Sequence, residues 1–241
     1  MRSIKLIPLA LSLMLASSLS FATDEHSSMV KPQPYKVGHA VTKAVQASIT
    51  PSAALDILKA GNQRFVSNKS IKRDNKKHIM QTGLGQYPFA SFVACIDSRS
   101  APELVFDLGV GDAFSARVAG NFVNSDIIGS LEFAAKVAGS RVIVVLGHSS
   151  CGAIKGACDD VKLGSLTGLI DQLKPAVTAV KYEGDRSSNN YKFVQKVADE
   201  NVELTVQKIR DMSPILKEME EKGQIKIVGA MLDVGTGKVS W

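Results

Sequence analysis

The stretch RVIVVLGHSSCG, residues 141–152, decides the fold. An uninterrupted apolar run, mostly β-branched, extends from Val142 to Leu146, which is typical of a strand buried on both faces of a parallel sheet. A short polar turn follows and carries His148 and Cys151. Because ligands of open parallel sheets bind beyond the carboxyl ends of the strands, we expect the functional site at this turn.

The rest of the chain alternates between apolar strands and helices. Residues 89–95 and 225–234 read as buried strands and 113–118 as a short one, whereas apolar residues recur at helical spacing in 52–66, 125–139, 151–173 and 189–213. This order predicts an α/β fold, a mainly parallel sheet with helices on both faces. The ending GTGKVSW, residues 235–241, predicts a last strand antiparallel to its predecessor.

A second strand ends in the same way as the first. FASFVAC ends on Cys95 and is followed by Asp97 and Arg99. Since parallel strands end at one edge of a sheet, these side chains are expected to meet His148 and Cys151 there. Two thiolates with one imidazole form a ligand set of catalytic zinc that leaves one position open. The residues therefore predict zinc at Cys95, His148 and Cys151, and they leave Asp97 open as a fourth ligand.

Asp97 and Arg99 have two interpretations from the residues alone. A zinc ion with two thiolate ligands is neutral and polarises its water weakly, so a nearby group that orders the hydroxide is valuable. Asp97 suits that role, with Arg99 holding it ionised and oriented. Alternatively, the two residues form a surface pair that caps the next short helix, within residues 101–106.

The cysteine count also favours a metal. The chain has three cysteines, an odd number without a disulfide framework. Cys158 lies about two helical turns beyond Cys151 and is interpreted as a packed free thiol rather than a ligand.

The N-terminus predicts export. Residues 1–22 place Arg2 and Lys5 before an apolar core and end in small residues at Ala22, as in a secretory signal peptide. The core is shorter than the roughly 20 residues of a membrane anchor, so no stable membrane insertion is expected. We expect cleavage near Ala22, a periplasmic or secreted location and a folded domain over 51–241. The polar leader, residues 23–50, is expected to be disordered or to wrap a partner subunit.

Charge gives little reason to expect nucleic acid as a partner. The formal net charge is +6, and the densest basic run, KSIKRDNKKH at 69–78, has no aromatic residues on which bases could stack. We interpret this run as a solvated helix face or loop.

At the strand ends, the sequence resembles the β-class carbonic anhydrases. CIDSR, residues 95–99, is similar to that family's C-x-D-x-R motif, and GHSSCGAIKGA, residues 147–157, is similar to its H-x-x-C-G segment. GDAFSARVAGNFV at 111–123 and GSLEFA at 129–134 lie between them as in the family. The resemblance covers about residues 51–241.

The resemblance implies one zinc ion per chain on Cys95, His148 and Cys151, with Asp97 and Arg99 as the catalytic dyad. It also implies a sheet of four parallel strands with an antiparallel fifth. It further implies a homodimer or homotetramer in which N-terminal helices embrace the partner.

The substrate pocket is also implied by the resemblance. Gln86 matches a glutamine that hydrogen-bonds substrate across the dimer interface. Phe114 and Phe133 match aromatic residues that line an apolar CO2 pocket, and Gly152 belongs to the H-x-x-C-G segment beside the zinc ligands.

Two positions favour the plant-like, open type of active site. Bicarbonate-inhibited members carry tryptophan three residues before the first zinc cysteine and glycine one residue before it. This chain has Phe92 and Ala94 there. Arg117 still matches an arginine of the inhibitory site.

The implied activity is zinc-dependent, reversible hydration of CO2 to bicarbonate and a proton by zinc-bound hydroxide. Two alternatives remain open from the sequence. One is hydrolysis of carbon disulfide or carbonyl sulfide on the same fold. The other is a non-enzymatic zinc or thiol protein in which Cys95 and Cys151 form a disulfide.

Overall fold

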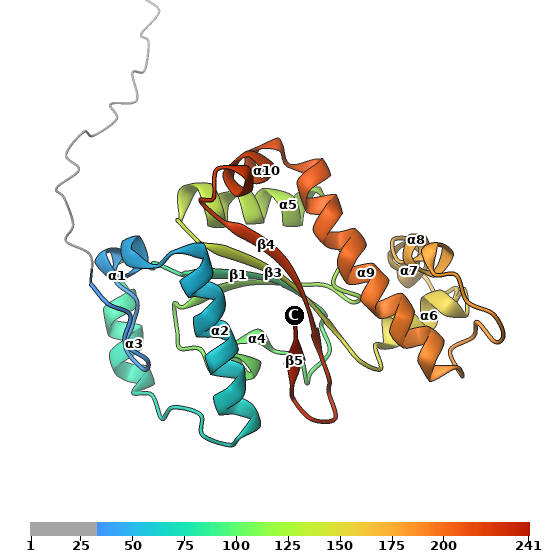
Figure 1. Cartoon of the computed structure of the whole chain (residues 1–241), viewed down its shortest axis with the longest axis horizontal. Helices are drawn as coiled ribbons and strands as arrows, with labels where there is room; N and C mark the ends of the chain where they lie inside the picture. The colour runs from blue at the N-terminus through green and yellow to red at the C-terminus, as the bar shows by residue number, and fades with distance from the viewer. Residues whose placement is uncertain (1–32) are drawn as a thin grey trace, which may run out of the picture. The chain divides into compact units, whose positions relative to one another are not determined.

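The computed structural model describes residues 33–241 (Figure 1). The predicted signal peptide and residues 23–32 of the leader lie outside the described residues. No helix in the described part of the chain is long and apolar enough to cross a membrane.

A five-stranded sheet forms the centre of the molecule. Its strands lie in the order β2-β1-β3-β4-β5, and all neighbouring pairs are parallel except β4 and β5. The predicted sheet of four parallel strands with an antiparallel fifth is therefore confirmed. The strands are β1 Ala90–Ala94, β2 Ala113–Arg117, β3 Val142–His148, β4 Lys226–Leu232 and β5 Val239–Ser240.

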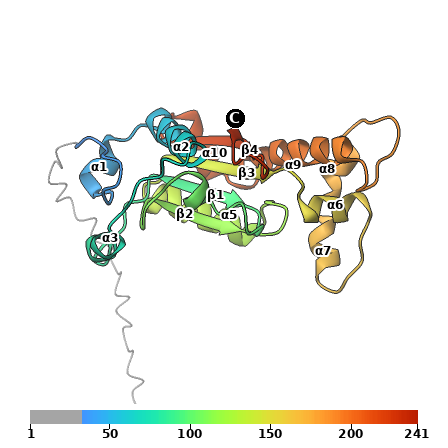
Figure 2. The same ribbon diagram turned by 90° about the horizontal axis from the view of Figure 1, so that it is seen from below.

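Ten α-helices surround this sheet in the described residues. They are α1 Lys43–Ser48, α2 Pro51–Val66, α3 Asn75–Thr82, α4 Pro102–Val105, α5 Ser125–Glu132, α6 Gly152–Cys158, α7 Leu166–Asp171, α8 Lys174–Ala179, α9 Tyr191–Met212 and α10 Pro214–Glu221. The predicted helix over 125–139 comprises α5 and a π-helical turn at Phe133–Val137. Figures 1 and 2 place α1 and α3 at one end of the molecule and α6, α7 and α8 at the other.

Alternate residues of β3 face two separate hydrophobic clusters. Val144 packs in one cluster with Leu58 of α2, and Val145 packs in the other with Val206 of α9. Every residue of β3 is buried because helices cover both faces of the sheet. The prediction of helices on both faces is confirmed.

The folded domain begins before residue 51, contrary to the predicted boundary. Residues 43–48 form α1, and Gln46 is buried. Its Nε2 donates hydrogen bonds to the carbonyl oxygens of Pro88 and Ala138, at 2.7 and 2.8 Å. These bonds satisfy backbone groups of the domain core, so the described part of the leader is an ordered part of that core.

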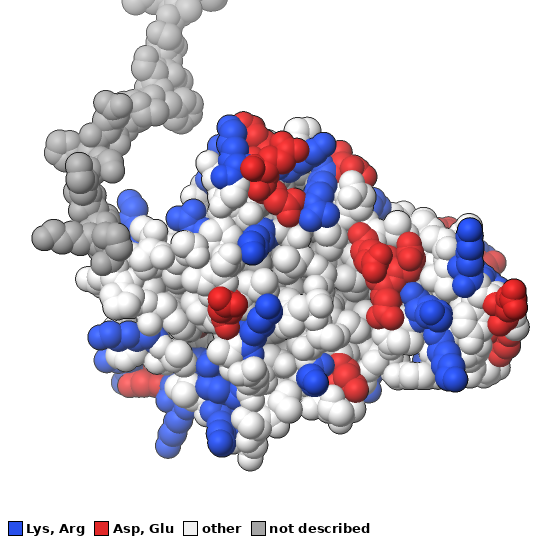
Figure 3. Space-filling model, viewed as in Figure 1, with Lys and Arg blue, Asp and Glu red and all other residues white. Residues whose placement is uncertain are grey.

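Charged side chains of both signs are interspersed on the face shown in Figure 3. The basic run at 69–78 is mostly exposed, as predicted, and spans a loop and the start of α3. Arg73 and His78 are its exceptions. Arg73 pairs with the buried carboxylate of Asp107, and His78 is buried.

Candidate metal centre

Three side chains meet at the carboxyl ends of two neighbouring strands. Cys95 follows β1 directly, His148 is the last residue of β3, and Cys151 is the N-cap residue of α6. The two sulfur atoms lie 4.0 Å apart, and all three potential ligand atoms lie within 4.8 Å of one another. All three side chains are buried. The predicted ligand set is thus assembled in one place.

The imidazole of His148 is oriented for metal binding. Its Nδ1 lies 2.9 Å from the carbonyl oxygen of Ser149, to which a protonated Nδ1 donates a hydrogen bond. This bond leaves the lone pair on Nε2, which is buried and has no hydrogen-bond partner. An orphaned nitrogen beside two thiols is the arrangement that a metal ion would satisfy.

The turn between His148 and Cys151 is held by β4. The Ser149 amide donates to the carbonyl oxygen of Leu232 at 2.8 Å, and the Ser149 hydroxyl accepts from the Val234 amide at 3.0 Å. Ser150 then takes a left-handed backbone conformation, with φ of 57°, which reverses the chain into α6. Both ligands of the turn are therefore fixed by backbone geometry.

The two thiols are electrostatically coupled. A hydrogen bond from the Cys151 thiol lowers the pKa of the Cys95 thiol to about 4, and the same pairing raises the pKa of Cys151. One thiolate forms readily, but a second, 4.0 Å away in a buried site, needs a cation to offset the repulsion. Two sulfur ligands and one nitrogen suit Zn²⁺, which binds N and S donors in a tetrahedral set.

The Asp97 carboxylate forms an ion pair with Arg99 and makes no hydrogen bond to the side chains of Cys95, His148 or Cys151. Oδ1 accepts from Nε at 3.0 Å, and Oδ2 accepts from Nη2 at 2.8 Å. These bonds hold the pKa of the Asp97 carboxyl well below its usual range. Asp97 Oδ2 lies 3.9 Å from His148 Nδ1, so the carboxylate is beside the metal centre.

The capping alternative for Asp97 and Arg99 is wrong. The N-cap residue of α4 is Ala101, and no side chain makes a capping hydrogen bond there. Arg99 pairs instead with Asp97, whose Oδ2 lies 3.9 Å from the Nδ1 atom of His148.

Cys158 lies outside the cluster, as predicted. It is partly buried near the end of α6, and burial raises the pKa of its thiol to about 11. It is neither a ligand nor a reactive thiolate near neutral pH.

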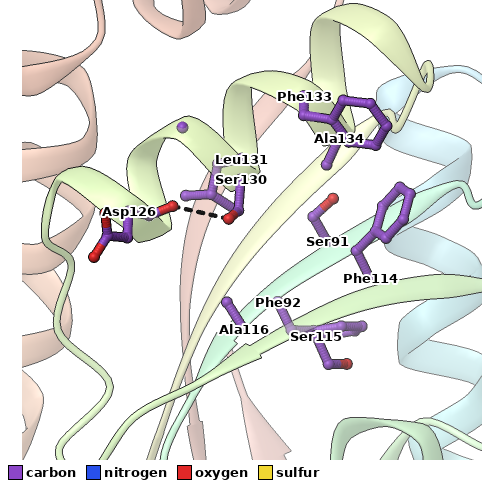
Figure 4. Close-up of a pocket in the computed structure, with 11 residues that line it drawn as sticks. Ser91, Phe92, Phe114, Ser115, Ala116, Asp126, Ser130, Leu131, Phe133 and Ala134 are labelled. Carbon is purple, nitrogen blue, oxygen red and sulfur yellow. Dashed lines mark hydrogen bonds between the residues drawn. The ribbon is translucent and has the colours of Figure 1, made fainter.

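The predicted aromatic residues line one pocket together. Phe114 and Phe133 meet edge-to-face, with ring centroids 6.2 Å apart, in a pocket of about 560 Å³ between α5 and the strands β1 and β2 (Figure 4). In the β-sheet register Phe114 pairs with Ser91, four residues before Cys95. At roughly 3.3 Å per residue, Phe114 is thus about 13 Å from Cys95 along the strand. Ala116, which also lines the pocket, pairs with Val93, two residues before Cys95, so the pocket extends toward the ligands.

Gly152 lies next to a predicted zinc ligand, whereas Gln86 does not contact the ligands through hydrogen bonds. Gly152 begins α6 directly after Cys151. Gln86 is exposed in the segment before β1 and makes no hydrogen bond to the ligands or to the dyad. One chain therefore places the ligands, the dyad and Gly152 together and leaves Gln86 without a hydrogen bond to them.

Arg117 has a role that its sequence match did not indicate. Its Nε donates to the carbonyl oxygen of Cys95 at 2.9 Å, and its Nη2 donates to that of Asp97 at 2.7 Å. The guanidinium thus supports the backbone that carries a ligand and the dyad. Its position at the end of β2, the strand beside β1, is the signal that could have predicted this contact.

Comparisons with known proteins agree with this geometry. Residues 90–239 match the family model described as carbonic anhydrase. The chain is 34% identical to carbonic anhydrase 2 of Mycobacterium tuberculosis over 194 residues, which cover 78% of this chain and 91% of that protein.

Solved structures with a similar fold carry the same family name. The β-carbonic anhydrase of Coccomyxa, solved in complex with acetazolamide, has a TM-score of 0.61 at 25% identity and covers 77% of this chain and 85% of its own. A tetrameric β-carbonic anhydrase of Sordaria macrospora has a TM-score of 0.58 at 26% identity, covering 75% and 92%. The matched motifs, the shared fold and the assembled ligands agree, and the chain belongs to the β class of the carbonic anhydrase family.

Proposed function

We propose that this protein is a zinc-dependent carbonic anhydrase, which converts CO2 and water reversibly to bicarbonate and a proton. The observation that carries the proposal is the bidentate Asp97–Arg99 pair beside the cluster of Cys95, His148 and Cys151. A structural metal site would need no such ionised carboxylate outside its ligand set.

The chain's own residues divide the work of the reaction. Cys95, His148 and Cys151 would hold zinc, which would supply a Lewis acid able to make water nucleophilic near neutral pH. Asp97 is ionised and can only accept hydrogen bonds, so it would orient a nucleophilic water beside the three ligands by accepting its proton in a hydrogen bond. Arg99 fixes the carboxylate in that orientation through two hydrogen bonds.

We propose that the active form is a homodimer or a larger assembly of dimers. Apolar side chains of Ile79, Met80 and Leu84 are exposed in and beside α3, and Phe133 is exposed at the pocket. Large exposed apolar side chains close together are typical of an interaction surface. The proposal is further supported by the tetrameric Sordaria macrospora relative and by the exposed Gln86, which one chain leaves away from the ligands.

We also propose that the protein is exported. The signal-like residues 1–22 support a periplasmic or secreted location. Cell fractionation, with N-terminal sequencing of the recovered protein, tests this, and an uncleaved chain in the cytoplasm would contradict it.

Zinc content tests the ligand assignment. Replacing Cys151 with serine removes one thiolate, and we expect the purified variant to lose both zinc and CO2 hydration, against about one zinc per wild-type chain. Metal analysis and stopped-flow hydration on the same sample measure this. Cys158→Ser is the matched control and should keep both. Full zinc occupancy in the Cys151 variant would show that the ligands are wrong.

Substitutions of Asp97 and Arg99 are expected to lower the rate of CO2 hydration without removing zinc. Asp97→Asn and Arg99→Ala should retain zinc and hydrate CO2 about 10- to 100-fold more slowly, because both residues act from outside the ligand set. Carbon disulfide and carbonyl sulfide serve as comparison substrates in the same assay. Wild-type rates in either variant would leave the pair without a catalytic role.

The pairing of Asp97 with Arg99 also predicts the open type of active site. Phe92 and Ala94 replace the residues of the bicarbonate site, and Arg117 is engaged with backbone carbonyls. Because Arg99 keeps the pKa of Asp97 low, the carboxylate stays ionised and paired as pH falls toward the acid range. We expect a hyperbolic dependence on bicarbonate and a non-cooperative acid limb in the pH-rate profile. A steep limb with cooperative bicarbonate inhibition would assign the other type.

The assembly predicts a mass larger than one chain. Analytical ultracentrifugation of the purified protein should give a dimer or a tetramer, and Leu84→Asp should shift the mass downward because it places a charge on the proposed contact. Leu163→Asp, at an exposed position between α6 and α7, is the control and should not. A monomer in the wild type would overturn the proposal.

A further inference from the structure

A buried amide interrupts the apolar face of α9. Asn201 is 4% exposed and lies between residues that pack in the core, such as Ala198 and Val202. Its Nδ2 donates a hydrogen bond of 2.9 Å to the carbonyl oxygen of Gly120, a residue 81 positions earlier in the chain. A buried amide costs free energy unless it is hydrogen-bonded, so the contact with Gly120 determines how the side chain is oriented.

Gly120 in turn contacts the zinc ligand Cys95. Its backbone amide donates to the Cys95 sulfur at 3.4 Å. Gly120 has a φ of +81°, and a Cβ atom there would lie 2.6 Å from a methyl carbon of Leu173. Only glycine fits this conformation, which turns the amide to the sulfur while the carbonyl faces Asn201.

The same segment holds Cys95 from its backbone side. Arg117 donates to the carbonyl oxygens of Cys95 and Asp97, and the amide of Val118 donates to that of Ala94 at 3.0 Å. Residues 117–120 therefore fix the ligand at its main chain and at its sulfur. Asn201 anchors this segment to α9, which packs against β3 and β4.

We propose that Asn201 and Arg117 are positioning residues that set how tightly the protein retains zinc, acting through residues 117–120 on Cys95. An amide that donates to a thiolate disperses its negative charge and restrains its direction, and both effects favour the metal-bound geometry. The proposal rests on zinc binding by Cys95, but not on the rate of CO2 hydration.

Zinc release from the loaded protein tests this inference. A chromogenic chelator in excess measures the release rate, and Asn201→Leu should release zinc about 10- to 100-fold faster than wild type, as is usual when an outer partner of a ligand is lost. Asn62→Leu is the matched control. Asn62 is 5% exposed in α2, and its Nδ2 also donates to two backbone carbonyls, those of Val105 and Gly237, which belong neither to Cys95 nor to residues 117–120.

A spectroscopic readout separates positioning from a loss of stability. In the Co²⁺-substituted protein, the thiolate-to-cobalt charge-transfer band should move to lower energy in Asn201→Leu, because Gly120 is released from α9 and its amide is no longer held against the Cys95 sulfur. The band should stay in place in Asn62→Leu, even where that variant unfolds more easily. Wild-type release and an unchanged band in Asn201→Leu, or equal acceleration in the control, would overturn the proposal.

Arg117→Ala keeps the test decisive if Asn201→Leu does not fold. Arg117 lies at an exposed position, so its removal leaves the hydrophobic core intact. It should release zinc faster than wild type because two bonds to the Cys95–Asp97 backbone are lost. Unchanged release in this variant would show that segment 117–120 does not control the ligand.

Discussion

The parallel pairing of β1 with β3 is the constraint on which the metal centre depends. Ala94 pairs with Leu146, so the residue after β1 and the last residue of β3 reach the same edge of the sheet. A slip of one residue would turn every side chain of β1 to the opposite face, and Cys95 would leave His148. The apolar residues of both strands fix this register, since alternate side chains pack in different hydrophobic clusters. Core packing thus specifies the spacing of the metal ligands.

The buried thiol pair couples the fold to the metal. Cys95 and Cys151 are almost fully buried, and burial opposes ionisation of both thiols. A divalent cation allows both to ionise, so metal binding adds to the free energy of folding and releases protons. The hydrogen bond between His148 and Ser149 prepares the third ligand before any metal arrives. The binding turn is therefore pre-organised by its own backbone.

The strands and the ligands could be predicted because their signals are local. The apolar run at 142–146 and the reactive residues that follow it stand together in the sequence. The contact of Asn201 with Gly120 joins residues 81 positions apart, and helical periodicity marks Asn201 only as a polar residue on an apolar face. The sequence left the structure of residues 33–50 open for the same reason. Gln46 is polar, and its partners are backbone carbonyls elsewhere in the fold.

The charges around the metal centre bear on the proposed roles of Asp97 and Arg99. Two thiolates would neutralise a divalent cation, and Asp97 offsets the charge of Arg99, which leaves the guanidinium of Arg117 as a further positive charge beside them. A cation neutralised by its ligands polarises water weakly, so under the proposed function the orientation of the nucleophile would contribute more to the rate. That contribution would come from the Asp97 carboxylate, which two hydrogen bonds from Arg99 hold in place. Arg117 in turn holds the backbone of Asp97.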